Sequence, residues 1–132
     1  MLFRSRGSFI SPMRSAIDKG IRAANHTDYN VTPVNQMFVV WSAVNRITRT
    51  GRVLGPQERI TPYEALQAIT INGAYMYFEE DSKGSLEPGK VADLVILDQN
   101  PLKVEPLAIK DIKVMETVKA GKPVFTLKGP TS

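Results

Sequence analysis

The spacing of apolar residues changes once along this 132-residue chain, between about residues 80 and 90. Before this point apolar residues recur at intervals of three and four, which is typical of helices with one buried face. After it they alternate with polar residues or form short runs, which is typical of strands. We therefore expect helical α/β structure over 11–82 and β-strands over 83–127. A frayed N-terminus over 1–10 and a tail over 128–132 would flank them.

The first part begins with a predicted helix followed by a predicted strand. Ser11 as N-cap and Pro12 at the first helical position open a short helix, which Gly20 ends. Residues 21–26 follow as a short strand, and Pro33 marks a loop beyond it because proline has no backbone donor. A helix, a tight turn and a strand in this order form one αβ step.

Two longer helical segments are expected before residue 80. One covers about 35–49, with Phe38 and Trp41 as core packing residues. The next begins at a capping box, in which the side chains of Thr61 and Glu64 each accept a hydrogen bond from the other residue's backbone amide.

The end of the helical part is less regular. Asn72 and Gly73 are expected to interrupt the helix that starts at the capping box, and 74–79 is expected to form another short one. We interpret its aromatic residues as packing residues; they are Tyr75, Tyr77 and Phe78.

The second part predicts three strands. Residues 92–98 are mostly apolar, so we expect a strand that is covered on both faces. Residues 112–119 alternate, as a half-buried strand does. Residues 120–122 form a tight turn, from which 123–127 returns as the second strand of a hairpin.

A carboxylate and the chain's one histidine lie where the strand over 21–26 is expected to run into a loop. These residues are Asp28 and His26. In barrel and doubly wound α/β folds, catalytic groups gather at such strand ends. A simpler interpretation stays open for each: Asp28 caps or turns the chain, and His26 is a hydrogen-bonded packing residue.

Composition excludes several kinds of site. With no cysteine and one histidine, the chain lacks the three or four ligands that a zinc site takes. The net charge of +4 divides into +6 over 1–55 and −2 over 56–132, but the basic residues are spread over several elements. We therefore expect no nucleic-acid partner. No apolar run approaches the ~20 residues of a membrane span and no signal-peptide core follows the basic start, so we expect a cytoplasmic protein without a membrane partner.

Three stretches together resemble the metal-dependent amidohydrolase superfamily, and within it the branch called amidohydrolase family 3, which includes N-substituted formamide deformylases. The first is 11–20 running into His-Thr-Asp at 26–28, and the second joins 43–46 to 59–66. The third, KGSLEPGKVADLVILD over 83–98, is the most specific. The resemblance covers about 11–127, yet only the C-terminal quarter or so of a full family member.

The resemblance implies an incomplete α/β plus β fold. Residues 11–82 would be the last βα step and the trailing helices of a TIM-type barrel, and 83–127 would be the C-terminal strands of a small β-sandwich. Asp28 matches the aspartate at the end of the family's eighth strand, which implies metal binding and proton transfer during hydrolysis. Three neighbours would lie in the substrate loop or beside the metal ligands: His26, Tyr29 and Asn30.

The family's other metal ligands, an early His-x-His pair, a lysine and later histidines, have no match in this sequence. We therefore expect a C-terminal fragment of a bacterial hydrolase that acts on carbon–nitrogen bonds of a small-molecule amide. It would share a divalent metal, zinc, only with a missing N-terminal part of the barrel, and would be inactive alone. The alternative is a non-catalytic module that self-associates or complements that part, because an incomplete barrel exposes strand edges and apolar faces.

Overall fold

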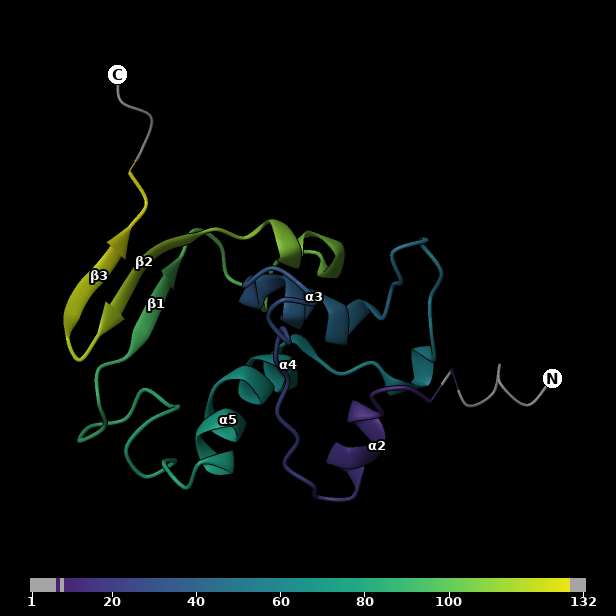
Figure 1. Ribbon diagram of the computed structural model, residues 1–132, viewed down its shortest axis with the longest axis horizontal. Coiled ribbons are helices and arrows are strands. Elements are labelled where there is room, and N and C mark those ends of the chain that lie inside the picture. Colours follow the sequence, from purple (N-terminus) through teal and green to yellow (C-terminus); the bar gives the residue numbers. More distant parts are fainter. Residues whose placement is uncertain (1–6, 8, 129–132) are drawn as a thin grey trace.

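The computed structural model describes residue 7 and residues 9–128. Four α-helices and a 3-10 helix lie in the described chain up to residue 76, and a three-stranded sheet lies toward the C-terminal end (Figure 1). The elements are α2 (Met13–Asp18), α3 (Gln36–Asn45), the 3-10 helix η1 (Pro56–Glu58), α4 (Pro62–Ile69), α5 (Ile71–Met76), β1 (Leu94–Leu97), the 3-10 helix η2 (Pro106–Asp111), β2 (Val114–Lys119) and β3 (Lys122–Thr126). The predictions for 1–6, 8 and 129–132 lie outside the described residues.

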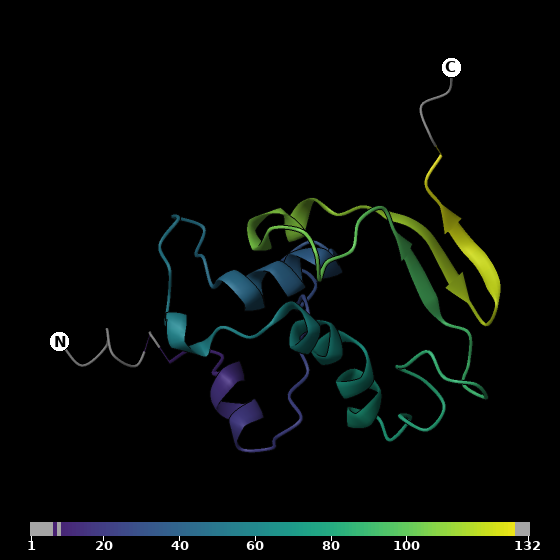
Figure 2. The same ribbon diagram turned by 180° about the vertical axis from the view of Figure 1, so that it is seen from behind.

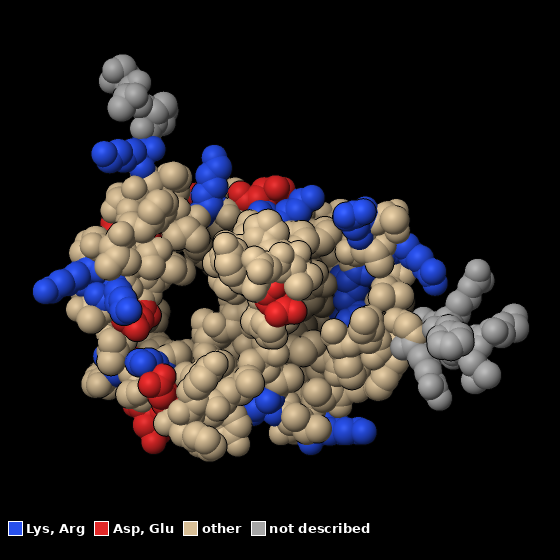
Figure 3. All heavy atoms as spheres, viewed as in Figure 1, with Lys and Arg blue, Asp and Glu red and all other residues tan. Residues whose placement is uncertain are grey.

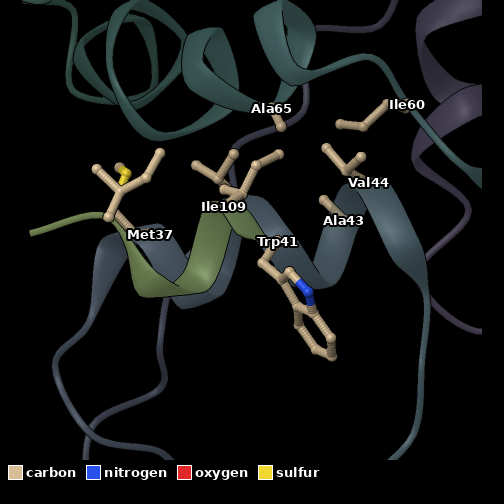
Figure 4. Packing of buried hydrophobic residues seen from close by; sticks show 9 residues of the cluster. Met37, Trp41, Ala43, Val44, Ile60, Ala65 and Ile109 are labelled. Carbon is tan, nitrogen blue, oxygen red and sulfur yellow. The ribbon is translucent and has the colours of Figure 1, made fainter. Parts of the chain in front are cut away.

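The hydrophobic core forms around α3. Val40 of α3 and Ile109 of η2 are fully buried, and Ala65 of α4 faces them. In Figure 4 the side chain of Ile109 points from η2 toward α4, while the Trp41 ring extends away from α4. Three segments that are far apart in sequence therefore close one core. Its buried members are Met37, Val40, Trp41, Ala43, Val44, Ile60, Ala65, Ile109 and Ile112.

The prediction that Trp41 packs in the core is confirmed, because its side chain is buried. Phe38 stacks on it with ring centroids 5.4 Å apart but is 37% exposed, so the same prediction is wrong for Phe38. The ammonium of Lys110 lies 5.2 Å from the Trp41 ring. The η2 helix that carries Lys110 was not expected from the sequence. It starts after Glu105 with Pro106 at the first position, and it returns the chain to α3 from the strand region.

Helix α2 begins one residue later than predicted. Met13 is its first residue, Ser11 has a left-handed φ of 48°, and no side chain caps the start. The predicted end is confirmed, since Gly20 has φ 71° and its N–H donates to the Ile17 carbonyl at 2.8 Å. Met13 and Ile17 pack against the core.

Helix α3 is shorter than the predicted 35–49. It begins after Asn35, whose side chain accepts from the Phe38 amide, and it ends at Asn45 because Arg46 adopts a left-handed φ of 54°. The guanidinium of Arg46 donates to three backbone carbonyls, those of Ile10, Ser11 and Leu54. The residues beyond turn back on themselves through a bridge between Ile47 and Val53.

The capping box is confirmed. The Thr61 hydroxyl accepts from the Glu64 amide at 3.2 Å, and the Glu64 carboxylate accepts from the Thr61 amide at 2.8 Å. The predicted interruption at Asn72 and Gly73 is wrong, because both lie inside α5 and the break falls at Thr70, with φ −125° and ψ −95°.

The packing interpretation of the aromatic residues after Gly73 is wrong. Tyr77 and Phe78 are 77% and 90% exposed, and Tyr75 is 41% exposed beneath the Arg22 guanidinium, 4.5 Å from its ring. Helix α5 ends at Met76, and Phe78 takes a left-handed φ of 59°, which turns the chain away from the core.

The sheet is antiparallel in the order β1-β2-β3, with β2 in the centre. Leu94 of β1 pairs with Val118, and Glu116 of β2 pairs with Thr126. The predicted hairpin is confirmed, and its turn uses left-handed φ values of 49° at Ala120 and 76° at Gly121. Among residues 9–128 the three strands thus form a meander, in which β1 and β3 each have one edge that pairs with no other strand.

The prediction that 92–98 is covered on both faces is wrong for this chain. Val95 and Ile96 are about half exposed, and every residue of β3 is exposed. Figure 2 shows the sheet set apart from the helices at one end of the molecule. Apolar strand residues that we expected to be buried therefore face solvent.

The predicted strand over 21–26 is also wrong within the described residues. Residues 21–27 have no strand assignment, because none of the three strands of the sheet lies beside them. This segment runs from α2 up to α3 (Figure 1). In the described part of the chain, none of the helices is long and apolar enough to cross a bilayer.

Candidate functional site

Asp28 lies in a turn directly after the segment 21–27. Its φ is 50°, a left-handed value that aspartate tolerates better than most residues. Its carbonyl accepts from the Val31 amide at 2.7 Å, which closes the turn, and the side chain of Thr32 donates to the Thr27 carbonyl. The residue is exposed, and its carboxylate has no hydrogen-bond partner within residues 7 and 9–128. The turn therefore presents a free carboxylate at the surface.

The backbone of Asp28 is tied to His26. The Asp28 N–H donates to His26 Nδ1 at 3.0 Å, and the His26 N–H donates to Asn25 Oδ1 at 3.0 Å. Because Nδ1 accepts a hydrogen bond, the neutral imidazole carries its proton on Nε2. His26 is exposed, so the packing interpretation of this histidine is wrong, although it is hydrogen-bonded.

Tyr29 and Asn30 continue the turn and are exposed. Asn30 has φ 112°, a value that side-chain-bearing residues rarely adopt. Neither residue packs on the core. Asp28, Tyr29 and Asn30 lie in one turn, and His26 lies two residues before it with a direct contact to the Asp28 amide.

An open hollow of about 590 Å³ lies next to this turn, between α2 and α3. His26 and Thr27 belong to its wall, whereas Asp28 stands outside it. The remaining wall is mostly apolar: Ile10, Ser11, Pro12, Met13, Ala16, Ala23, Ala24, Asn25, Thr32, Phe38, Val39, Ser42, Ala43, Arg46, Ile47, Thr48 and Leu54. Burial lowers the pKa of Arg46, whose guanidinium is engaged by backbone carbonyls rather than open to a ligand.

Two asparagines support the turn, and the sequence predicted no such role for either. Asn25 accepts the His26 amide, and the Asn72 side chain donates to the Ala23 carbonyl at 3.0 Å. An asparagine in a helix interior is a weak signal in sequence, since its partner lies 49 residues away. The structure reveals both as part of the turn's support.

Residues 2–125 match the amidohydrolase family. The chain belongs to the amidohydrolase family. It is 34% identical over 110 residues to an N-substituted formamide deformylase of Arthrobacter pascens, a match that covers 83% of this chain and 20% of that protein.

A second relative of this amidohydrolase-family chain is an imidazolonepropionase of Treponema denticola, 35% identical over 91 residues, covering 67% of the chain and 19% of the relative. A crystal structure of an amidohydrolase from Thermotoga maritima superposes with a TM-score of 0.66 at 22% identity, covering 87% of this chain and 26% of that one. The chain thus spans about a fifth of the length of these curated relatives and shares its fold with part of a solved amidohydrolase.

Amidohydrolases are generally metal-dependent, so this amidohydrolase-family chain is expected to contribute side chains that bind a metal ion. Among the described residues, no three His, Asp or Glu side chains lie close enough together to hold a metal ion. Asp28 and His26 provide one carboxylate and one imidazole, short of the three or four protein ligands of a zinc site. The described residues therefore do not fit a complete metal centre.

Proposed function

We propose that this chain is the C-terminal part of a metal-dependent amidohydrolase of the cytoplasm, in which Asp28 supplies the catalytic carboxylate. The whole protein hydrolyses a carbon–nitrogen bond in a small amide or N-acyl compound. Residues 11–82 serve as the last part of a catalytic barrel, and 83–127 serve as strands of a β-sandwich. The names of the relatives support this class of reaction, since one acts on an N-substituted formamide.

The observation that carries the proposal is the state of Asp28. Its backbone is fixed by the His26 contact, while its carboxylate is exposed and free of partners among the described residues. A carboxylate that serves only as a turn former normally accepts from its own backbone two residues on. Among the described residues the Asn30 amide makes no such bond to Asp28, and the His26 ring accepts from the Asp28 backbone N–H instead. The carboxylate therefore remains available to a reacting group.

Amide hydrolysis needs a base for the attacking water and an acid for the leaving nitrogen. Asp28 accepts one proton from the water as the carbon–oxygen bond forms, and gives that proton to the nitrogen as the carbon–nitrogen bond breaks. Tyr29 and Asn30 lie in the same turn and His26 contacts its first amide, so in this proposal these three residues line the substrate loop. A divalent metal such as zinc would take its remaining ligands from polypeptide outside residues 7 and 9–128.

Complementation tests this function. The 132-residue chain is mixed with the part of the Arthrobacter deformylase that precedes the matched region, in the presence of Zn²⁺ and an N-substituted formamide. We expect turnover only when both polypeptides are present, and a loss of at least about 100-fold for Asp28→Asn, which cannot take up the proton. Asp81→Asn, an exposed acid far from the turn in sequence, is the matched control. Full activity of Asp28→Asn would rule out the proposed role.

A non-catalytic interaction module is the second candidate, favoured by the exposed apolar surface after α5. Phe78, Tyr77 and Leu86 are each more than three-quarters exposed. Tyr77 and Leu86 border a hollow of about 510 Å³ between α5 and β1, and an opening between the sheet and the helices is visible in Figure 3. Apolar patches of this kind mark surfaces that meet another polypeptide.

Light scattering coupled to size-exclusion chromatography tests the module. We expect the chain to form a dimer or larger species that dissociates when Tyr77 and Phe78 are both replaced by serine. Tyr63→Ser, at a tyrosine of α4 that is also exposed, is the control. A monomer with a cooperative melt at all concentrations would exclude self-association.

We propose no nucleic-acid partner, because Lys and Arg stand apart on the face in Figure 3.

A further inference from the structure

The segment 21–27 is held on one side by the junction of α4 and α5. The Asn25 N–H donates to the Ala68 carbonyl at 3.0 Å, and the Asn72 side-chain amide donates to the Ala23 carbonyl at 3.0 Å. Ala23 and Asn25 are two residues apart, and in extended backbone such residues turn their polar groups to the same side. The Ala68 carbonyl and the Asn72 side-chain amide therefore bond to the same side of residues 23–25, as the backbone of a neighbouring strand would.

Both partners come from the break between the two helices. The last carbonyls of a helix have no partner inside it. At the end of α4 the Leu66 and Gln67 carbonyls accept from the hydroxyl and the amide of Thr70, which leaves the Ala68 carbonyl for Asn25. Asn72 stands in the first turn of α5, four residues further on, and supplies the missing donor.

We propose that Asn72 is a positioning residue that fixes the register of residues 23–25 and thereby aims the Asp28 turn. This inference rests on the proposed function of Asp28. The connection runs through consecutive contacts: Asn25 accepts the His26 amide, and His26 accepts the Asp28 amide. A slip of one residue would turn the Asn25 N–H away from the Ala68 carbonyl and reverse the side on which the residues leading to the Asp28 turn project.

The role requires a carboxamide. The Ala23 carbonyl can only accept, so its partner must donate. Aspartate has almost the same shape as asparagine, but its carboxylate would face the carbonyl oxygen without a proton between them. Asn72→Asp therefore removes the donor with little change in volume, and Asn72→Ala removes it with the side chain. Met76→Ala, an exposed position on the same helix, is the matched control.

Nuclear magnetic resonance of the isotope-labelled full chain tests the proposal without substrate or metal. In both Asn72 variants we expect the Asn25 amide to exchange with solvent about 3- to 10-fold faster, as the loss of one hydrogen bond implies. We also expect the His26 imidazole nitrogens and the Asp28 amide to shift, because the acceptor at Nδ1 is no longer held. Met76→Ala should leave all three signals in place.

A folded Asn72→Ala or Asn72→Asp chain with unchanged Asn25, His26 and Asp28 signals would overturn the proposal. If neither variant folds, the test is the scalar coupling across the hydrogen bond from Asn72 Nδ2 to the Ala23 carbonyl carbon in the unaltered chain. Its presence supports the positioning contact, and its absence overturns it. These readouts contain no turnover, so a failure of the Asp28→Asn complementation assay is separable from a failure here.

Discussion

Ser15 binds both carboxylate oxygens of Glu58. Its backbone N–H donates to Oε2 at 2.9 Å, and its hydroxyl donates to Oε1. Glu58 is buried at the end of η1, so this pair fastens α2 to the loop that follows α3. The two hydrogen bonds from Ser15 hold the pKa of Glu58 below its ordinary value of 4.5, and the positive charge of Arg46 lowers this pKa further. Burial acts against both effects, because it raises the pKa.

The Glu58 contact predicts a loss of stability in acid. A carboxyl group whose folded pKa is depressed stabilises the fold above its unfolded pKa, and this contribution disappears as the pH falls through the folded value. We therefore expect the melting temperature to decrease once the pH is lowered below about 4.5. Ser15→Ala should make the melting temperature less dependent on pH in this range. Thermal melts from pH 7 to 3 measure it, with Glu105→Gln, an exposed acid, as control. A Ser15→Ala chain with the same acid profile would contradict the assignment.

Glu64 adds to the same pH dependence through a different contact. Burial would raise its pKa, but hydrogen bonds from Thr61 and from the Arg14 guanidinium, at 2.8 and 2.9 Å from its two oxygens, lower the pKa overall. We expect Arg14→Met to destabilise the chain at pH 7, and to do so less as the pH falls and Glu64 becomes protonated. Chemical denaturation at pH 7 and pH 3 gives the difference, and an equal loss at both would contradict it.

Gly84 is predicted to be intolerant of a side chain. A Cβ there would lie 2.9 Å from both the Ala74 Cβ and the Ile71 Cα, and its φ is 87°. Gly89 has a similar φ of 93° but open space around it. We therefore expect Gly89→Ala to cost about 1 kcal/mol from backbone strain alone, and Gly84→Ala about 1–3 kcal/mol more. Urea denaturation of the two variants isolates the steric part, and equal losses would show that the contact with α5 is not tight.

Ile109 is predicted to stabilise the helical core although it follows the first strand. Its side chain is fully buried against α3, so Ile109→Ala should cost about 2–5 kcal/mol in the free energy of unfolding. Leu107 on the same 3-10 helix is more than half exposed, and Leu107→Ala should change that free energy by about 0.5 kcal/mol or less. Urea denaturation compares them; similar effects would mean that η2 does not close the core.

The purified chain alone is predicted to be inactive toward amides with Zn²⁺ added. Its described residues bring no three metal-binding side chains together. Hydrolysis of a simple N-acyl substrate is followed at increasing Zn²⁺, and the chelated chain is the control. Turnover that follows the rigorously purified chain, and that disappears in Asp28→Asn, would contradict this prediction.

Local signals in the sequence predicted the elements that depend on neighbouring residues. The capping box of Thr61 and Glu64 and the hairpin turn at Ala120 and Gly121 are confirmed, because each needs only contacts within a few positions. Helix α3 was predicted too long because apolar spacing continues past Asn45, whereas Arg46 ends it with a left-handed φ and bonds to the distant carbonyls of Ile10 and Ser11. The spacing of residues holds no trace of such contacts.

The errors at exposed apolar residues have a different cause. Tyr77, Phe78 and Val95 have the sequence character of buried residues, and nothing in the described chain covers them. Residues 21–26 were predicted to form a strand from their apolar residues, although no strand of the described sheet lies alongside them. Asp28 and His26 do lie together, as expected from their closeness in sequence. Asn72 was interpreted only as a helix interruption, because its partner Ala23 is remote in sequence.

The return of η2 to α3 has a consequence for biosynthesis. Val40 leaves the ribosome 69 residues ahead of Ile109, the side chain that completes its burial. At about 5–20 residues per second, roughly 3–14 s pass with that apolar face uncovered on the nascent polypeptide. During this interval a chaperone that holds nascent chains would bind the apolar face of α3. A premature stop codon anywhere before Ile109 would leave that face exposed.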